Sequence, residues 1–273
     1  MKKILVATDF SACASNAMEY ALDLALVIDV EVCAIHAIGT FEGIFNNTYN
    51  ALYIEEYYQS KRAALDSWAH GFTSRAAYKG INVTTASDVG SVSGVITKYI
   101  EANAVELLVM GTMGSSGIAG LFGSNASTMV EKTKTPTLII PLESKFAVKP
   151  VITLATDFSK GLSEGDVTAL NELVKAFGSE RLEVINVVED GILKTNEPGE
   201  ENLRKLIPGT NLEFQYIKED STSAGILNYV VASATDILCL VKRHHNLVYR
   251  LFNTSTVNKV MGRSVKAILV MHE

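Results

Sequence analysis

The sequence predicts an α/β protein made of two tandem doubly wound parallel-sheet units, arranged as a pseudo-twofold pair. The first observation is a repeat, because Ala-Thr-Asp-Phe-Ser at residues 7–11 returns at residues 155–159, each time after an apolar run. The second is that continuous apolar runs alternate with helical patterns, which is typical of strands buried on both faces of a parallel sheet. We therefore expect one domain over residues 1–143 and a second over residues 148–273.

Composition narrows the class of protein. A chain of 273 residues suits two domains that each bury a core, and a charged fraction of 20% is that of a globular protein. The net charge of -6 argues against nucleic acid or an anionic membrane as a partner. No apolar run approaches the length of a membrane span. Cys13, Cys33 and Cys239 show no paired spacing, which argues against a disulfide framework or zinc site and favours the cytoplasm.

The elements of the first unit follow from hydrophobic periodicity. Residues 4–7 are a short apolar run, and residues 15–27 carry an apolar stripe at helical spacing. Residues 30–37, 81–86, 106–110 and 137–140 are the further predicted strands. A helix around Leu65, Trp68 and Phe72, a helix around Val95 and Ile96, and a helix from residue 124 to about 133 are expected between them.

The second unit repeats this order after a junction at residues 141–150, which two prolines bracket. Predicted strands lie at residues 151–154, 182–188, 212–217, 236–241 and 267–270, and helices at 164–177 and 224–234. Residues 196–211 are shorter than their counterpart and contain Pro198 and Pro208. This stretch is predicted to lack a full equivalent of the Trp68 helix.

Asp9 lies at the predicted carboxyl end of the first strand, where ligands bind in open parallel sheets. Its carboxylate suits a ribose hydroxyl or a base amino group as a hydrogen-bond donor. The alternative is that Asp9 caps the following helix. Because Ser11 can cap that helix by itself, the sequence favours an Asp9 that is left free for a ligand.

A glycine-rich loop follows the fourth strand, with Gly111, Gly114, Gly117, Gly120 and Gly123. Such loops let backbone amides approach an anion, and the helix behind the loop directs its positive end toward it. Ser124 and Asn125 are predicted to cap that helix. Because the loop has no Lys or Arg, neutralisation would fall to amides, the helix end and a magnesium ion. The alternative is a flexible polar connector.

These residues together resemble the universal stress protein family, in a tandem form that covers essentially the whole chain. The features are a first strand ending in Thr-Asp-Phe-Ser, then Gly-x-x-Gly, a spacer, and Gly-Ser opening the last helix. Nucleotide-binding members carry a nine-residue spacer, whereas residues 115–122 are eight. The resemblance implies a Rossmann-like, adenine nucleotide alpha hydrolase-like fold that holds ATP or AMP, with or without Mg²⁺. It also implies that the halves pack through their last strands and that the protein pairs as a homodimer.

Carried over by position, the resemblance implies roles for eleven residues. Ala7, Thr8 and Asp9 would face the adenosine, and Ala37 and Met110 would line the base pocket. The remaining positions would hold the phosphates and ribose, and they are Gly111, Thr112, Gly114, Gly123, Ser124 and Asn125.

The second copy lacks the motif glycines, because Val241, His244 and Asn253 stand at those positions. Side chains there would fill the room that a phosphate chain needs, so a triphosphate site in the second half is not expected. Asp157 is then interpreted as part of the geometry that starts the next helix.

Three other features have competing interpretations. The basic cluster is interpreted as a solvated loop, with an anion or partner contact as the alternative. A metal site there is not expected. His36 is predicted to be a core residue, and the tyrosine-rich segment would cover the pocket, form an oligomer interface or pack in the core. The cluster is Lys242, Arg243, His244, His245 and Arg250, and the tyrosines are Tyr49, Tyr53, Tyr57 and Tyr58.

The sequence thus predicts a stress-associated adenine-nucleotide binding and signalling protein, whose occupied loop changes the surface shown to an unidentified protein partner. A nucleotide-free dimeric scaffold is the alternative. A slow ATPase is disfavoured because the loop has no cation to stabilise a transferring phosphoryl group. It also has no Asp or Glu between Gly111 and Thr128 to position water.

Overall fold

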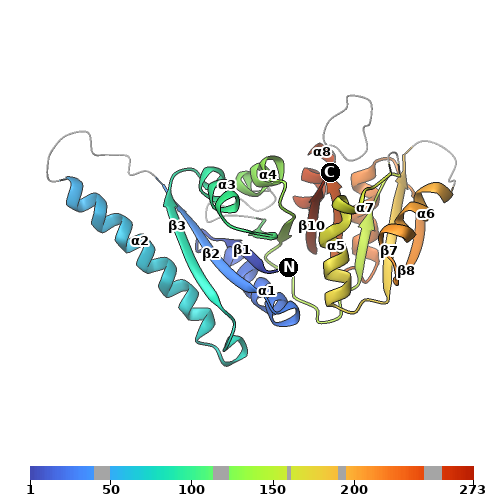
Figure 1. The fold of residues 1–273 in the computed structure, drawn as a ribbon. Coiled ribbons are helices and arrows are strands. Elements are labelled where there is room, and N and C mark those ends of the chain that lie inside the picture. The colour runs from blue at the N-terminus through green and yellow to red at the C-terminus, as the bar shows by residue number, and fades with distance from the viewer. Residues whose placement is uncertain (40–49, 113–122, 159–160, 190–194, 243–253) are drawn as a thin grey trace.

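The computed structural model describes residues 1–39, 50–112, 123–158, 161–189, 195–242 and 254–273. These form one 10-stranded sheet in the order β3-β2-β1-β4-β5-β10-β9-β6-β7-β8 (Figure 1). All neighbours are parallel except β5 and β10, so each half has the predicted doubly wound order. The strands are β1 Lys3–Ala7, β2 Glu31–Ile38, β3 Val83–Val89, β4 Leu107–Gly111, β5 Thr137–Ile140, β6 Ile152–Ala155, β7 Arg181–Val188, β8 Asn211–Lys218, β9 Ile237–Lys242 and β10 Ala267–His272.

Helices cover both faces of the sheet. One buried cluster joins the sheet to α1 Ala12–Ile28, α2 Asn50–Thr73, α5 Glu164–Ala176 and α6 Glu197–Leu206. The opposite cluster joins it to α3 Val92–Ala102, α4 Ser124–Lys132, α7 Thr222–Ala232 and α8 Thr254–Met261. A short 3-10 helix, η1, spans Ala76–Tyr78. We call β1–β5 with α1–α4 the first half, and β6–β10 with α5–α8 the second half.

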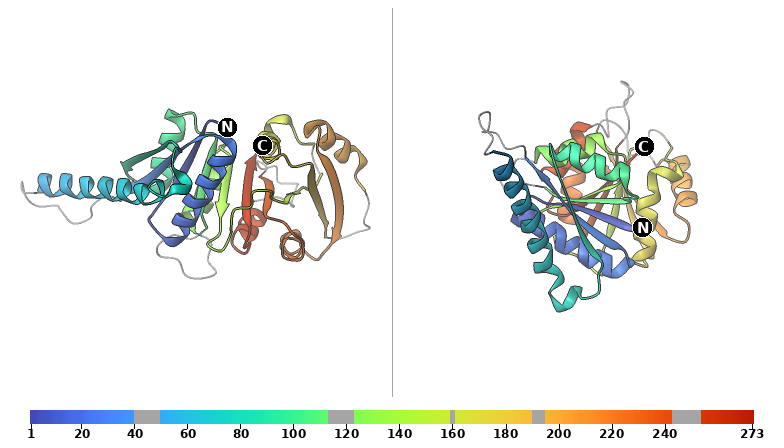
Figure 2. Two further views of the ribbon diagram at one scale, coloured as in Figure 1. Left: turned by 90° about the horizontal axis from the view of Figure 1, so that it is seen from below. Right: turned by 60° about the vertical axis from the view of Figure 1, so that its left-hand side comes forward.

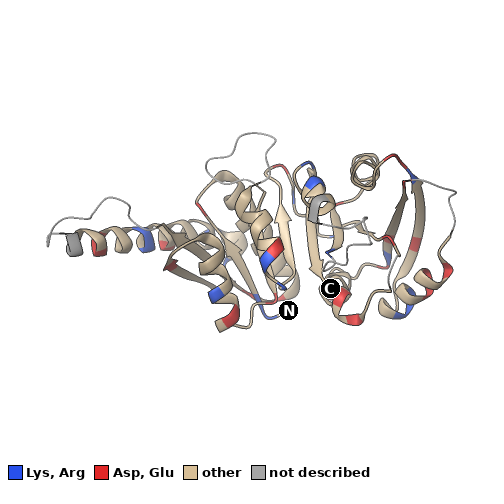
Figure 3. Ribbon diagram, turned by 90° about the horizontal axis from the view of Figure 1, so that it is seen from above, with Lys and Arg blue, Asp and Glu red and all other residues tan. Residues whose placement is uncertain are grey.

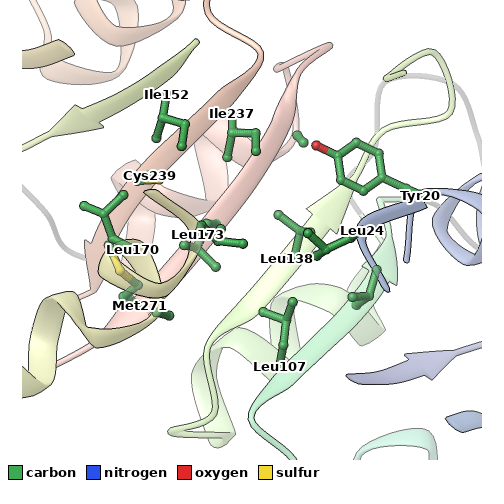
Figure 4. Close-up of a cluster of buried hydrophobic side chains, with 14 of the residues drawn as sticks. Tyr20, Leu24, Leu107, Leu138, Ile152, Leu170, Leu173, Ile237, Cys239 and Met271 are labelled. Atoms are coloured by element: carbon green, nitrogen blue, oxygen red, sulfur yellow. The ribbon is translucent and has the colours of Figure 1, made fainter. Parts of the chain in front are cut away.

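The two halves meet at the antiparallel pair β5–β10, with Leu138 opposite Leu269. This confirms the expectation that the halves pack through their last strands. Figure 4 shows side chains of both halves converging at this seam, so the core is continuous across it. Because the halves run antiparallel, the carboxyl ends of their parallel strands lie at opposite edges of the sheet.

The connection between the halves is held in place. The Asn16 amide donates to the carbonyls of Pro141 and Ser144, both at 2.9 Å. The ring of Phe146 packs edge-on against Tyr20 of α1, with centroids 5.2 Å apart. The segment is therefore packed against α1 rather than extended into solvent.

The halves differ most in the crossover after their second strand. Helix α2 has 24 residues and α6 has 10, so the second half has a shortened counterpart, as predicted. Asn196 caps α6 by accepting from the amide of Gly199 at 3.0 Å, and Pro198 lies in the first turn, where a missing amide proton is tolerated. Figure 2 shows α2 extending well beyond the sheet.

The tyrosine-rich segment lies on this extended part of α2. Tyr53 is 72% exposed, so core packing is the wrong interpretation for that side chain. Tyr57 and Tyr58 contact one another with ring centroids 5.5 Å apart. Tyr49 lies outside the described residues.

Figure 3 shows acidic and basic residues interspersed along the described ribbon, with neither sign confined to one half. Of the helices in the described ranges, none is both long enough and apolar enough to cross a membrane.

Candidate nucleotide site

The candidate site lies where three neighbouring parallel strands of the first half end. Strand β1 lies between β2 and β4, and its residues pair in register with both, so Val6 lies beside Ala34 and Val109. The segments after β1 and β4 therefore leave the sheet at one edge. This topology brings Asp9 and the described start of the glycine-rich loop, Gly111 and Thr112, to the same edge of the sheet, as the sequence predicted.

The chain leaves β1 through a tight, hydrogen-bonded turn. The hydroxyl of Thr8 accepts from the amide of Phe10 at 3.0 Å, and Phe10 adopts a positive φ of 66°. The carboxylate of Asp9 accepts from the amide of Ser11 at 3.1 Å, and the Ser11 hydroxyl accepts from Ala14 at 3.1 Å. Ser11 is thus the helix cap, as predicted.

The expectation of a free Asp9 is wrong, because its carboxylate forms part of this turn. Asp9 is half-buried. Because Ser11 caps α1 directly, the helix begins at Ala12, three residues before the predicted start.

His36 belongs to this edge, although the sequence analysis assigned it to the core. It is half-buried, and its Nδ1 lies 2.8 Å from the carbonyl oxygen of Thr8. Since a carbonyl only accepts, Nδ1 carries the proton. The Phe10 ring lies 4.5 Å from the imidazole and 6.0 Å from Trp68. The available signal was the position of His36 directly before Ala37 at the end of a strand.

Gly111 closes the sheet against α1. A Cβ at this position would lie 2.8 Å from the Sγ of Cys13 and 3.1 Å from its carbonyl carbon. The next residue, Thr112, places its hydroxyl 3.7 Å from the same sulfur. The missing side chain at Gly111 is therefore explained by helix–strand packing, a reason that the sequence analysis did not identify.

The glycine-rich loop leaves and re-enters the sheet edge at one point. The amide of Gly123 donates to the carbonyl of Thr112 at 2.8 Å, which closes the loop at its base. Gly123 then occupies the N-cap of α4, with no side-chain hydrogen bond to the cap. The prediction that Ser124 and Asn125 cap the helix is wrong, because they are its first two residues and are exposed.

A glycine cap has a chemical consequence. The first amide protons of a helix have no partner within it, and a Ser or Asp cap would satisfy some of them. In the described part of the chain, no side chain accepts from the first-turn amides of α4. The positive end of the helix dipole is at this edge of the sheet.

The other predicted site residues are partly accounted for. Ala7 and Met110 are 9% and 5% exposed, and both lie in the core cluster beneath α3 and α4. Ala37 is half-buried against the same cluster. Gly114 and the spacer at 115–122 lie outside the described residues.

The described ranges gather no group of three or more His, Cys, Asp or Glu side chains that could hold a metal ion. Cys13, Cys33 and Cys239 are buried and form no disulfide.

The corresponding edge of the second half is built differently. Helix α5 begins at Glu164 with Ser163 as cap, so the interpretation of Asp157 as helix-start geometry is wrong. The solvated-loop interpretation is also wrong for Lys242, which is 7% exposed. The other members of the basic cluster lie outside the described residues, as do two of the three residues that replace motif glycines, His244 and Asn253.

Comparison with known proteins agrees with this architecture. The sequence model of the Universal stress protein family matches residues 1–141. A universal stress protein of Methanocaldococcus jannaschii is 27% identical over 147 residues, which cover 53% of this chain and 84% of that protein.

Solved structures extend the likeness to the whole chain, as a likeness of fold. A universal stress protein from Archaeoglobus fulgidus superposes with a TM-score of 0.75 at 21% identity, covering 99% of this chain and 98% of its own. A second structure, described as that of a possible universal stress protein from Pseudomonas aeruginosa, has a TM-score of 0.61 at 14% identity and covers 100% and 93%. Because the family model spans more than half of the sequence, the chain belongs to the universal stress protein family.

Proposed function

We propose that residues 1–143 form a domain that binds an adenine nucleotide, ATP or AMP, and that residues 148–273 form a domain without this activity. The observation that carries the proposal is the closure of the glycine-rich loop by Thr112 and Gly123 at the edge where Asp9 lies. This closure places the uncapped amides of α4 beside the end of β1.

Each residue of the proposed site has a role that its chemistry supports. The first-turn amides of α4 at Ser124 and Asn125 would bind the phosphates, together with the backbone of Gly114 and Gly123. The carboxylate of Asp9, at the end of β1, would accept from a ribose hydroxyl. The adenosine would lie against the backbone of Ala7, Thr8, Ala37 and Met110. Gly111 and Thr112 would contact the phosphates or ribose, and Mg²⁺ would neutralise phosphate charge.

The biological role follows from the lack of catalytic groups in the loop sequence. We propose a stress-associated sensor in the cytoplasm, in which nucleotide changes the loop and hence the surface shown to a protein partner. The three unbridged cysteines support a reducing compartment. A homodimer would have to use a surface other than the last-strand edges, because β5 and β10 already pair within the chain.

A nucleotide-free scaffold is the second candidate, and one observation favours it. The glycine at position 111 is explained by its approach to Cys13, with no ligand needed. The presence of the family's glycine at position 111 is therefore compatible with a packing role alone.

One substitution separates the two candidates. Gly123→Asp places a carboxylate among the α4 amides and would abolish binding of ATP and AMP in calorimetry, with the fold preserved in circular dichroism. Gly71→Asp is the matched control, since a Cβ at Gly71 meets nothing within 4 Å. Mass spectrometry of nucleotide released from purified protein gives an independent reading. No released nucleotide and no calorimetric binding in the wild type would favour the scaffold.

A further inference from the structure

Helix α4 belongs to the first half, yet the second half holds its far end. The Nζ of Lys242, at the end of β9, donates to the carbonyl of Val130 in the last turn of α4 at 2.9 Å. In the middle of the same helix, the hydroxyl of Ser127 lies 3.0 Å from the Oδ1 of Asn258 on α8. Two elements of the second half thus contact one helix of the first.

The lysine contact satisfies a group that a helix cannot satisfy by itself. The last four carbonyls of an α-helix have no partner within it, and Val130 is among them in α4. A cation at this end is also favourable toward the helix dipole. Burial lowers the pKa of Lys242, while the nearby Glu131 carboxylate acts in the opposite direction. This side chain is therefore a structural partner of α4 rather than a solvated charge.

The antiparallel seam gives the contact its direction. The amino end of α4 lies at the edge of the sheet that carries Asp9, because the helix follows β4. Its carboxyl end lies at the opposite edge, where β9 ends. Nine residues of helix span about 13 Å, so α4 connects the Lys242 contact at one edge of the sheet to the first-turn amides at the other.

Among the described residues, the contact of Lys242 with Val130 has no symmetric counterpart at Thr112. Strand register places Lys242 at the position that Thr112 has in the first half, since Leu108 pairs with Leu5 and Leu238 with Thr153. Thr112 contacts Cys13 in its own half. Thr112 therefore contacts its own half, whereas Lys242, at the same position in the second half, contacts the first half across the seam.

We propose that Lys242 is a positioning residue through which the second half orients α4, and so sets the affinity of the first half for nucleotide. This inference rests on the proposed nucleotide site, because α4 supplies the amides that bind phosphate there. It gives the second half a function after the loss of its own glycine-rich loop.

The test compares three full-length variants with the wild type. Lys242→Met keeps the length of the side chain without the donor, and Lys242→Arg restores a cationic donor. Lys266→Met is the matched control, since Lys266 is a partly exposed lysine of the second half that pairs with Asp236 at 3.8 Å. ATP affinity is measured by calorimetry, and hydrogen exchange of the α4 amides is measured without nucleotide.

Lys242→Met is expected to weaken ATP binding about three- to tenfold and to speed exchange across α4, with recovery in Lys242→Arg and no change in Lys266→Met. Equal effects of the two methionine variants, or wild-type affinity and exchange in Lys242→Met, would overturn the inference. If the wild type binds no ATP, the proposed function fails, and exchange alone decides whether Lys242 positions α4. If Lys242→Met does not fold, the shorter Lys242→Gln replaces it under the same two outcomes.

Discussion

The same five residues occur at the end of the first strand of both halves, and the structure describes the first four of them in each. Thr8 and Thr156 accept from the amides of Phe10 and Phe158, at 3.0 and 3.4 Å. The two phenylalanines share a positive φ, 66° and 52°. Beyond this turn the halves diverge, because α1 follows at once whereas α5 begins at Glu164. The repeated pentapeptide therefore encodes a turn, and the residues after it decide whether a helix follows.

A second contrast concerns bulk at the base of the glycine-rich loop. Gly111 lies against Cys13 in the first half. Strand register places Val241 at the position of Gly111, and counting from the repeated pentapeptide places Gly161 at that of Cys13. A Cβ at Gly161 would meet only the Asn202 side chain, at 4.0 Å, among the described residues, so the close approach of Gly111 to Cys13 has no counterpart at this position.

The largest effect is expected when the close approach of Gly111 to Cys13 is disrupted. Gly111→Ala would lower the free energy of unfolding by about 2 kcal/mol, because its Cβ overlaps the sulfur and backbone of Cys13. Urea unfolding measures the loss. Gly39→Ala is the control, since a Cβ there meets nothing within 4 Å. Equal midpoints for the two variants would refute the packing explanation.

An intermediate effect is expected at the strand ends. His36 Nδ1 lies 2.8 Å from the carbonyl of Thr8, and the Asn186 amide donates to that of Thr156 at 2.8 Å. His36→Ala would cost about 1 kcal/mol in unfolding free energy, because the carbonyl loses its partner. His36→Asn introduces the residue that the second half has at this position, Asn186, and would retain most of the stability. A loss in His36→Asn as large as in His36→Ala would show that the two hydrogen bonds are not equivalent.

The smallest effect concerns a carboxylate present in one half only. Glu189 accepts from the amide and hydroxyl of Thr222 at the start of α7, at 2.6 and 2.7 Å, whereas register places Gly39 at the same position in the first half. These two hydrogen bonds lower the pKa of Glu189, and the bond from the Thr222 hydroxyl has the larger effect. Because the pKa of Glu189 is lower in the folded state than its ordinary value of 4.5, the ionised carboxylate stabilises the fold at pH values above 4.5. This stabilisation is lost as the pH falls through the folded-state pKa.

Glu189→Gln should therefore lower the unfolding free energy by about 0.5 kcal/mol at neutral pH. The difference from the wild type should shrink as the pH falls below 4.5, the ordinary value for this group. Urea midpoints measured across this range check the prediction. A difference that does not depend on pH would mean that side-chain shape, rather than charge, is responsible.

The sheet was largely predictable because its strands are buried on both faces. Residues 30–37 and 182–188 were predicted, and the structure has Glu31–Ile38 and Arg181–Val188. Helix starts were less predictable, since they depend on which of several polar residues becomes the cap. Ser11 and Gly123 took that role in α1 and α4, which moved one start and left Ser124 inside the other helix.

The candidate site was predictable as a location but not in its contacts. The predicted strand ends identified the edge of the sheet, and the repeated glycines identified the loop beside it. The approach of Gly111 to Cys13 and the bond from His36 to Thr8 join residues distant in sequence, so no local pattern indicates them. Lys242 is buried against Val130 because β5 pairs with β10 and brings the two halves together. The basic residues around Lys242 in the sequence do not indicate this contact.

That pairing of β5 with β10 has an evolutionary consequence. In an assembly of two identical chains, every substitution occurs twice, and each copy must tolerate it. Joining the copies in one polypeptide removes this constraint and fixes their stoichiometry at one to one, whatever the protein concentration. One copy is then free to specialise in ligand recognition while its twin is selected for support.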